Sequence, residues 1–128
     1  MKCLRIYATP DGSHFGDADI AMPMMPLFPN ETSFGLSAHY PASRIRFVHV
    51  PAGVCEVSWH RPPERGLAVW LDGIVEFETS DREVRQVSAG GFVLVEDTHG
   101  KAHISRHPAE GQNTILITLP NGLDRPSG

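Results

Sequence analysis

Residues 59–73 read WHRPPERGLAVWLDG, and this stretch decides the fold. His60 stands where a β-rich run meets a loop, and the Asp72-Gly73 pair near the end of the stretch is typical of a two-residue hairpin turn. Residues 90–97 (GGFVLVED), followed by His103, repeat the pattern later in the chain. These two segments together predict a closed β-barrel, with the imidazoles of His60 and His103 pointing into its mouth.

Short β-rich runs continue on both sides of this stretch. Twelve Gly and eleven Pro leave no room for a long helix, and alternation of apolar and polar residues is typical of half-buried strands. A second hairpin turn is expected at residues 80–83. Many short strands at regular spacing predict an all-β sandwich or barrel. The expected strands are residues 5–7, 44–50, 54–59, 67–71, 74–79, 83–87, 91–95, 103–106 and 114–119.

The bulk properties indicate one ordinary domain, residues 1–128, with 41% hydrophobic residues and a formal charge of −4. An acidic chain without a basic stripe is not expected to bind nucleic acid. No window approaches the roughly 20 apolar residues that cross a bilayer, and no signal peptide is recognised, so no membrane partner is expected. Cys3 and Cys55 lie in no metal or redox spacing, which favours reduced thiols and a cytoplasmic protein.

Residues 12–41 lack this regularity and contain three prolines between positions 23 and 29. We interpret them as an irregular arm that wraps the barrel or a partner subunit. The arm has apolar side chains that would be costly to expose. They are Met22, Met24, Met25, Leu27 and Phe28.

The chain resembles the cupins, which are small double-stranded β-helix barrels. Gly53 and His60, followed by residues 67–73, are similar to the first cupin motif, and residues 91–97 with His103 are similar to the second. Trp-His before the first motif and the residues DTHGKAH at 97–103 resemble one cupin subgroup in particular.

The resemblance covers about residues 45–119. It implies a single cupin domain, with its barrel core over these residues and an N-terminal arm over 12–41. Because cupin barrels commonly associate in pairs, it also implies a homodimer, across which the arm exchanges.

In cupins, three histidines and a glutamate usually hold a divalent metal. Here His60 occupies the first histidine position, but Pro62 and Gly66 stand at the second histidine and glutamate positions, and His107 stands at the asparagine position of the second motif. The resemblance therefore carries over only His60 and His103.

One hypothesis is a metal site formed by His60, His99 and His103, with Glu64 as a weaker ligand. Such ligands suit zinc with one position open, or iron, manganese or nickel. The alternative is that His60 and His103 are hydrogen-bonded cavity histidines without a metal.

Without a metal, His60 and His103 can still form an acid/base pair, because imidazole titrates near neutral pH. In the register of the motif, Gly66 and Ala68 face inward and leave space, and Trp70 supplies a flat wall for a planar ligand. The alternative for Trp70 is an ordinary core position.

Further candidates surround this pair. Trp59 would lower the local polarity. Arg61 and Arg65 could hold an anionic substrate at the rim, or simply form a solvated face. Glu96 and Asp97 follow a buried strand and could act as acid or base, or Asp97 could only cap the next turn.

Three classes of function follow from these features. The leading one is an enzyme whose small-molecule substrate binds inside the barrel, with His60 and His103 performing proton transfer as in an isomerase, dehydratase or lyase; a metal-dependent oxygenase is a variant of it. The second is a non-catalytic ligand binder or sensor, because cupin barrels host both roles. The third is an assembly role for the arm.

Overall fold

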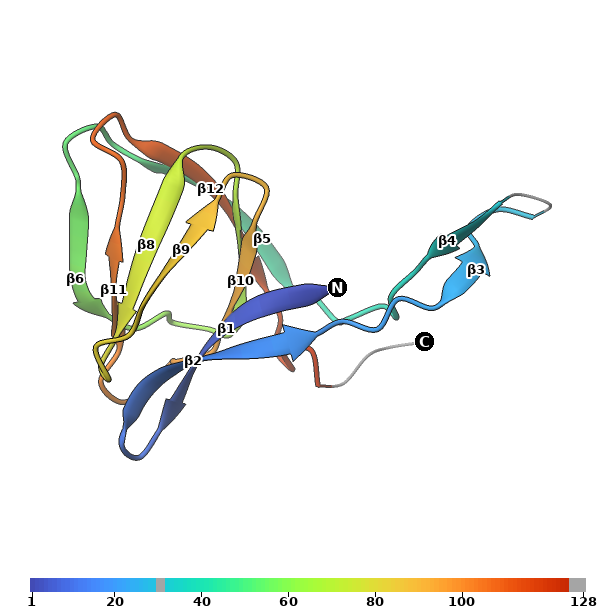
Figure 1. Ribbon diagram of the computed structural model, residues 1–128, viewed down its shortest axis with the longest axis horizontal. Helices are drawn as coiled ribbons and strands as arrows, with labels where there is room; N and C mark the ends of the chain where they lie inside the picture. The colour runs from blue at the N-terminus through green and yellow to red at the C-terminus, as the bar shows by residue number, and fades with distance from the viewer. Residues whose placement is uncertain (30–31, 125–128) are drawn as a thin grey trace.

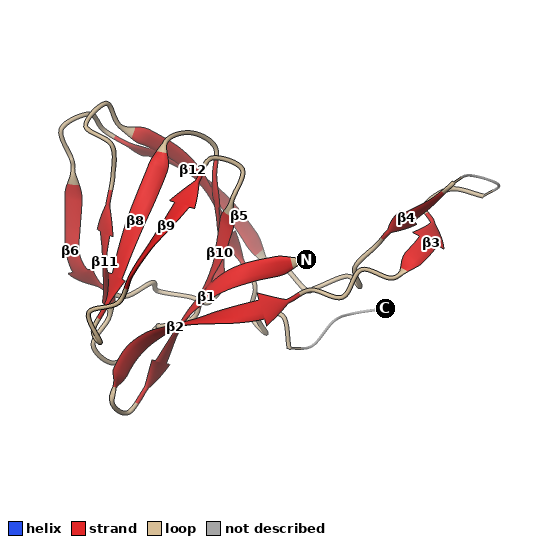
Figure 2. Cartoon of the chain, viewed as in Figure 1, coloured by secondary structure: helices blue, strands red, loops and turns tan. Residues whose placement is uncertain are grey.

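The chain is described by a computed structural model that covers residues 1–29 and 32–124. This part of the chain contains strands and loops, and no helix (Figure 2). The all-β prediction is therefore confirmed. The strands are β1 (Lys2–Thr9), β2 (Gly12–Asp19), β3 (Met24–Pro26), β4 (Ser33–Gly35), β5 (Arg44–Val50), β6 (Glu56–His60), β7 (Gly66–Trp70), β8 (Ile74–Thr79), β9 (Val84–Ser88), β10 (Phe92–Val95), β11 (His103–Arg106) and β12 (Gln112–Thr118).

Most strands belong to two sheets that face each other (Figure 1). One has six strands in the order β2-β1-β10-β7-β12-β5, and the other has four in the order β6-β11-β8-β9. All pairs are antiparallel except β1 with β10. Within the described residues no strand pairing joins the two sheets, so the closed barrel expected from the sequence is not found.

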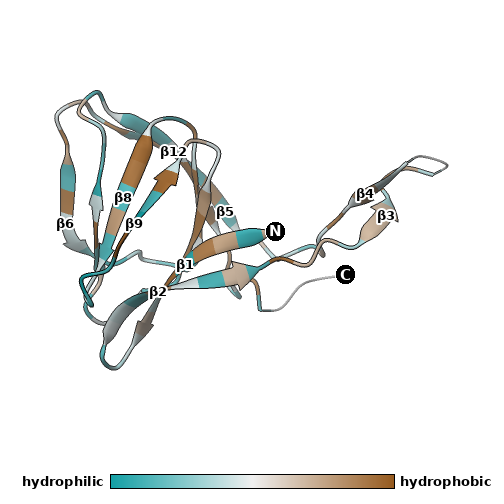
Figure 3. Cartoon of the chain, in the orientation of Figure 1, coloured by the Kyte–Doolittle hydropathy of each residue, from teal (hydrophilic) through white to brown (hydrophobic). Residues whose placement is uncertain are grey.

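The hydrophobic core lies between the two sheets. Six strands contribute to it, and on β8 the contributing residues are Val75 and Phe77, two positions apart as expected for one face of a strand. Figure 3 shows the hydrophobic, brown part of β8. The core residues are Ile6, Phe15, Ala68, Trp70, Val75, Phe77, Val87 and Val93. Because Ile6 and Phe15 belong to it, the core begins well before residue 45, where the sequence placed its start.

A second cluster covers the opposite face of β1 and β10. Leu94 packs there with Cys3, Ile20 and Leu119. Coverage of both faces explains why β10 is an uninterrupted apolar run rather than an alternating one.

The two predicted hairpins have different outcomes. Residues 80–83 join β8 to β9, which are antiparallel neighbours, so this hairpin is confirmed. Asp72-Gly73 also forms a turn, with a positive φ of 60° at Gly73, but β7 and β8 belong to different sheets. The hairpin predicted there is wrong, because the turn carries the chain from one sheet to the other.

The predicted arm is wrong for residues 12–19. They form β2, which pairs along its whole length with β1. The segment that does project from the body contains the small β3–β4 hairpin (Figure 1). Its exposed apolar side chains are Met22, Met24, Met25, Leu27, Phe28 and Phe34.

Candidate functional site

His60 and His103 lie next to each other on neighbouring strands. β6 and β11 pair antiparallel with His60 opposite His103, and the register shifts between His103 and Ser105. The two rings meet edge to face, with centroids 4.4 Å apart. The expected convergence of these two histidines is therefore present.

Asp97 holds the ring of His103 in place. The Nδ1–H group of His103 donates a hydrogen bond of 2.5 Å to Oδ2 of Asp97. The Asp97 side chain is fully buried, and His103 is only 3% exposed. This bond fixes the tautomer in which Nε2 of His103 carries the free lone pair. The sequence offered Asp97 as an acid, a base or a turn cap, and its orienting role was missed; the available signal was a carboxylate directly after a buried strand.

His60 is fixed in the same tautomer. Its Nδ1–H group donates to the backbone oxygen of Ser58 at 2.9 Å. Burial of the ring lowers the pKa of His60 below its usual value, and the nearby His103 contributes in the same direction. At neutral pH, His60 is therefore uncharged beside His103, with its own Nε2 available as an acceptor.

Both histidines line a cavity of about 460 Å³ between the two sheets, here called the central cavity. Its apolar wall includes Val48, Val50, Ala68, Val95 and Leu116. Its polar interior includes Ser105, His107 and Thr114 beside the histidine pair. His103, Ser105 and His107 thus share one face of the chain, as alternate residues of an extended segment do.

Aromatic rings enclose the inner end of the central cavity. Phe77 meets His103 with ring centroids 5.7 Å apart, and Trp70 lies 6.0 Å from Phe77. Trp70 is buried and lines the cavity, yet its Nε1–H group has no hydrogen-bond partner among the described residues. A buried indole N–H without an acceptor is costly, and because this nitrogen is itself enclosed by protein atoms, that cost belongs to the packing of the core.

The other predicted binding residues do not all lie in the central cavity. Ala68 and Trp70 face the central cavity and Arg61 lies at its mouth. Trp59 is 43% exposed and is not part of the lining. Gly66 borders the cavity, but a Cβ there would overlap the backbone oxygen of Ile117. Glycine at this position therefore allows β7 to approach β12 closely, rather than creating room for a ligand as the sequence analysis assumed.

The remaining proposed metal ligands do not join the histidine pair. His99 lies in the exposed turn that precedes β11, outside the cavity lining. Glu64 is at the mouth, where it pairs with Arg44 and accepts a hydrogen bond from Thr118. Over residues 1–29 and 32–124, no group of three or more His, Cys, Asp or Glu side chains is arranged to hold a metal ion.

Arg65 and Glu96 are used in a structural network. The buried Glu96 carboxylate forms ion pairs with both Arg65 and Arg5, and Arg65 also reaches Asp124 at 2.9 Å. Burial acts to lower the pKa of Arg65, but the hydrogen bonds and charges of Glu96 and Asp124 together outweigh it and raise the pKa. This network ties β1, the β6–β7 loop and the C-terminal turn together, so neither residue is free to act on a substrate.

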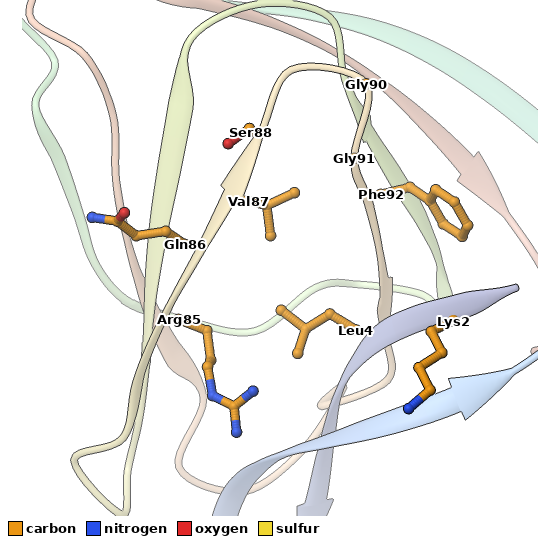
Figure 4. A pocket seen from close by; sticks show the side chains of 9 residues that line it. All are labelled: Lys2, Leu4, Arg85, Gln86, Val87, Ser88, Gly90, Gly91 and Phe92. Carbon is orange, nitrogen blue, oxygen red and sulfur yellow. The ribbon is translucent and has the colours of Figure 1, made fainter.

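A second cavity, of about 450 Å³, lies on the other side of the core (Figure 4). Leu4, Val87 and Phe92 supply its apolar surface, and Lys2 and Arg85 supply positive charge. Arg85 is already paired with Glu83 at 2.6 Å. Among the residues that the structure describes, no histidine or carboxylate belongs to its lining.

In the described part of the chain, no helix is long and apolar enough to cross a membrane.

No family model and no curated protein matches the chain. Among solved structures, the chain is similar to protein NMB1881 from Neisseria meningitidis, with 15% identity over 66% of this chain and 87% of that one, at a TM-score of 0.47. It is also similar to the conserved SPY1581 protein of unknown function from Streptococcus pyogenes, with 19% identity over 66% of this chain and 65% of that one, at a TM-score of 0.43.

Proposed function

We propose that this protein is an enzyme that performs proton transfer on a small molecule in the central cavity. The observation that carries the proposal is the buried hydrogen bond between Asp97 and His103, directly beside a cavity large enough for a small substrate. A carboxylate that orients an imidazole is a recurring arrangement for a general base.

The proposed chemistry begins at Nε2 of His103. A C–H bond of the substrate breaks, its proton moves to Nε2, and the electron pair stays on the substrate. Asp97 keeps the ring in place and faces the imidazolium that forms. His60 stays uncharged, because burial lowers its pKa, and it does not repel this cation. Return of the proton to another carbon gives an isomerase, whereas loss of a neighbouring leaving group gives a lyase or dehydratase.

For the fold, we propose a cupin-type barrel in which the two sheets are not joined to each other by strand pairing. It is supported by two facing sheets and by histidines on β6 and β11. The parallel pairing of β1 with β10 is an addition to that plan.

The nitrogen atoms of His60 and His103 are suited to a bound divalent metal only in part. His60 and His103 both keep Nε2 free, and the Asp97–His103 bond resembles the outer partner of a metal-bound histidine. Among the described residues no third ligand joins them, whereas catalytic sites usually have three protein ligands. The proposed steps therefore use no metal, and the oxygenase variant is less favoured.

The test of this function is hydrogen–deuterium exchange at carbon. Small oxo compounds, charged and neutral, are incubated with the protein in D2O, and loss of C–H signals is followed by NMR. We expect protein-dependent exchange in at least one compound and a loss of about 100-fold or more in His103→Ala. His49→Ala, which changes an exposed histidine bonded to Asn113, is the matched control. No exchange by the folded protein, or equal exchange in His103→Ala, would contradict the proposal and favour the non-catalytic binder.

We extend the proposal to a cytoplasmic homodimer. Cys3 and Cys55 are both free thiols, which suits a reducing compartment. The projecting β3–β4 segment exposes six large apolar side chains, and Ile45 and Phe47 are exposed on the edge strand β5. If two chains pack the β3–β4 segment and strand β5 against each other, this exposed apolar area is removed from water.

Sedimentation equilibrium tests the dimer. We expect twice the monomer mass of 14.0 kDa for the natural chain and the monomer mass for Phe34→Glu. Ile74→Glu changes a similarly exposed residue on β8 and is expected to leave the mass unchanged. If the natural chain sediments as a monomer, the projecting β3–β4 segment is not a dimer interface.

A further inference from the structure

The mouth of the central cavity is rich in arginine. Arg44, Arg46, Arg61 and Arg65 belong to its lining, against a single carboxylate, Glu64. This excess of positive charge is local, because the chain as a whole carries a formal charge of −4.

Two of these arginines make no direct contact with a carboxylate. Arg44 is paired with Glu64 at 2.5 Å, and Arg65 is paired with Glu96 and Asp124. Within the described residues, Arg46 and Arg61 are exposed and form no ion pair and no side-chain hydrogen bond, and Arg46 acts on Glu64 only through its charge. Each therefore offers a guanidinium fork that can bind a carboxylate through two parallel hydrogen bonds.

The interior adds a further requirement on a ligand. The wall formed by Val48, Ala68, Val95 and Leu116 is apolar and suits a hydrocarbon body. A ligand that satisfies both the mouth and this wall has a carboxylate at one end and an apolar body at the other.

We propose that the central cavity binds a carboxylate with an apolar body. Its carboxylate binds Arg46 and Arg61 at the mouth, and its body packs on the apolar wall. This inference rests on the proposed function for the reaction that follows, but the binding itself does not require turnover.

Calorimetry with two matched probes tests the inference. The probes are 3-benzoylpropionate and its uncharged methyl ester. We expect 3-benzoylpropionate to bind about tenfold more tightly than the ester. The double variant R46A/R61A should remove this preference for acid over ester.

Arg85→Ala is the matched control, because it removes an arginine from the second cavity, and the preference for acid over ester should survive in it. Equal binding of acid and ester, an acid preference that persists in R46A/R61A, or no binding of any probe at millimolar concentration would overturn the inference. Selective binding without deuterium exchange would instead contradict the proposed function alone. Exchange confined to uncharged compounds would support that function and overturn this inference.

Discussion

Replacing Asp97 by Asn is expected to lower the turnover number by about 100- to 10,000-fold while the protein remains folded. The asparagine amide has nearly the same shape as the carboxylate, but its NH2 group can donate a hydrogen bond to Nδ1 of His103. The ring then adopts the opposite tautomer, with its proton on Nε2, and can no longer accept a proton from the substrate.

The tautomer can be measured without any substrate. In the natural protein, 15N NMR of the imidazole should show a protonated Nδ1 and a free Nε2 in His103, and Asp97→Asn should reverse them. Asp72→Asn is the control, because the carboxylate of Asp72 is bonded to Asn113 and lies outside the central cavity. An Asp97→Asn variant with the natural tautomer and full exchange activity would show that Asp97 does not position the base.

Replacing Gly66 by Ala is expected to lower the free energy of unfolding by about 1–3 kcal/mol. The added Cβ would overlap the carbonyl oxygen of Ile117, which is backbone and cannot move aside without breaking the pairing of β7 with β12. Urea unfolding followed by circular dichroism measures the loss, and the melting temperature should fall by roughly 4 °C for each kcal/mol.

Gly16→Ala is the matched control for this change. Gly16 also lies inside a strand, but a Cβ there would meet the ring of Tyr7, a side chain that can turn away. Its stability should therefore change by less than about 1 kcal/mol. Equal losses in the two variants would mean that the close approach of β7 and β12 does not determine the cost.

The period of two in the sequence was sufficient to locate most strands. β5, β8 and β11 have the predicted bounds, and several others differ by one or two residues. β2 was missed, because its glycines and aspartates have low intrinsic strand preference. Backbone pairing with all of β1 stabilises it, and a local pattern cannot reveal that pairing.

The candidate site could be predicted only in part, because local sequence patterns again do not reveal contacts between distant segments. His60 and His103 could be selected because each follows or begins a β-rich run within a repeated pattern. Three features depend on contacts between distant segments: the orienting role of Asp97, the unpartnered Trp70, and the ion pairs that already occupy Arg65. His99 looked equivalent to the other histidines in spacing, and only its placement in an exposed turn separates it from them.

The sequence by itself determined the local properties of this protein: an all-β chain, the position of most strands, and two histidines at strand ends. These follow from side-chain alternation and from backbone preferences, which act over a few residues. Only the tertiary structure decided which strands share a sheet, which charges neutralise one another and which nitrogen of His103 faces the cavity. These depend on the pairing of segments far apart in the chain, where one shift in register changes every neighbour.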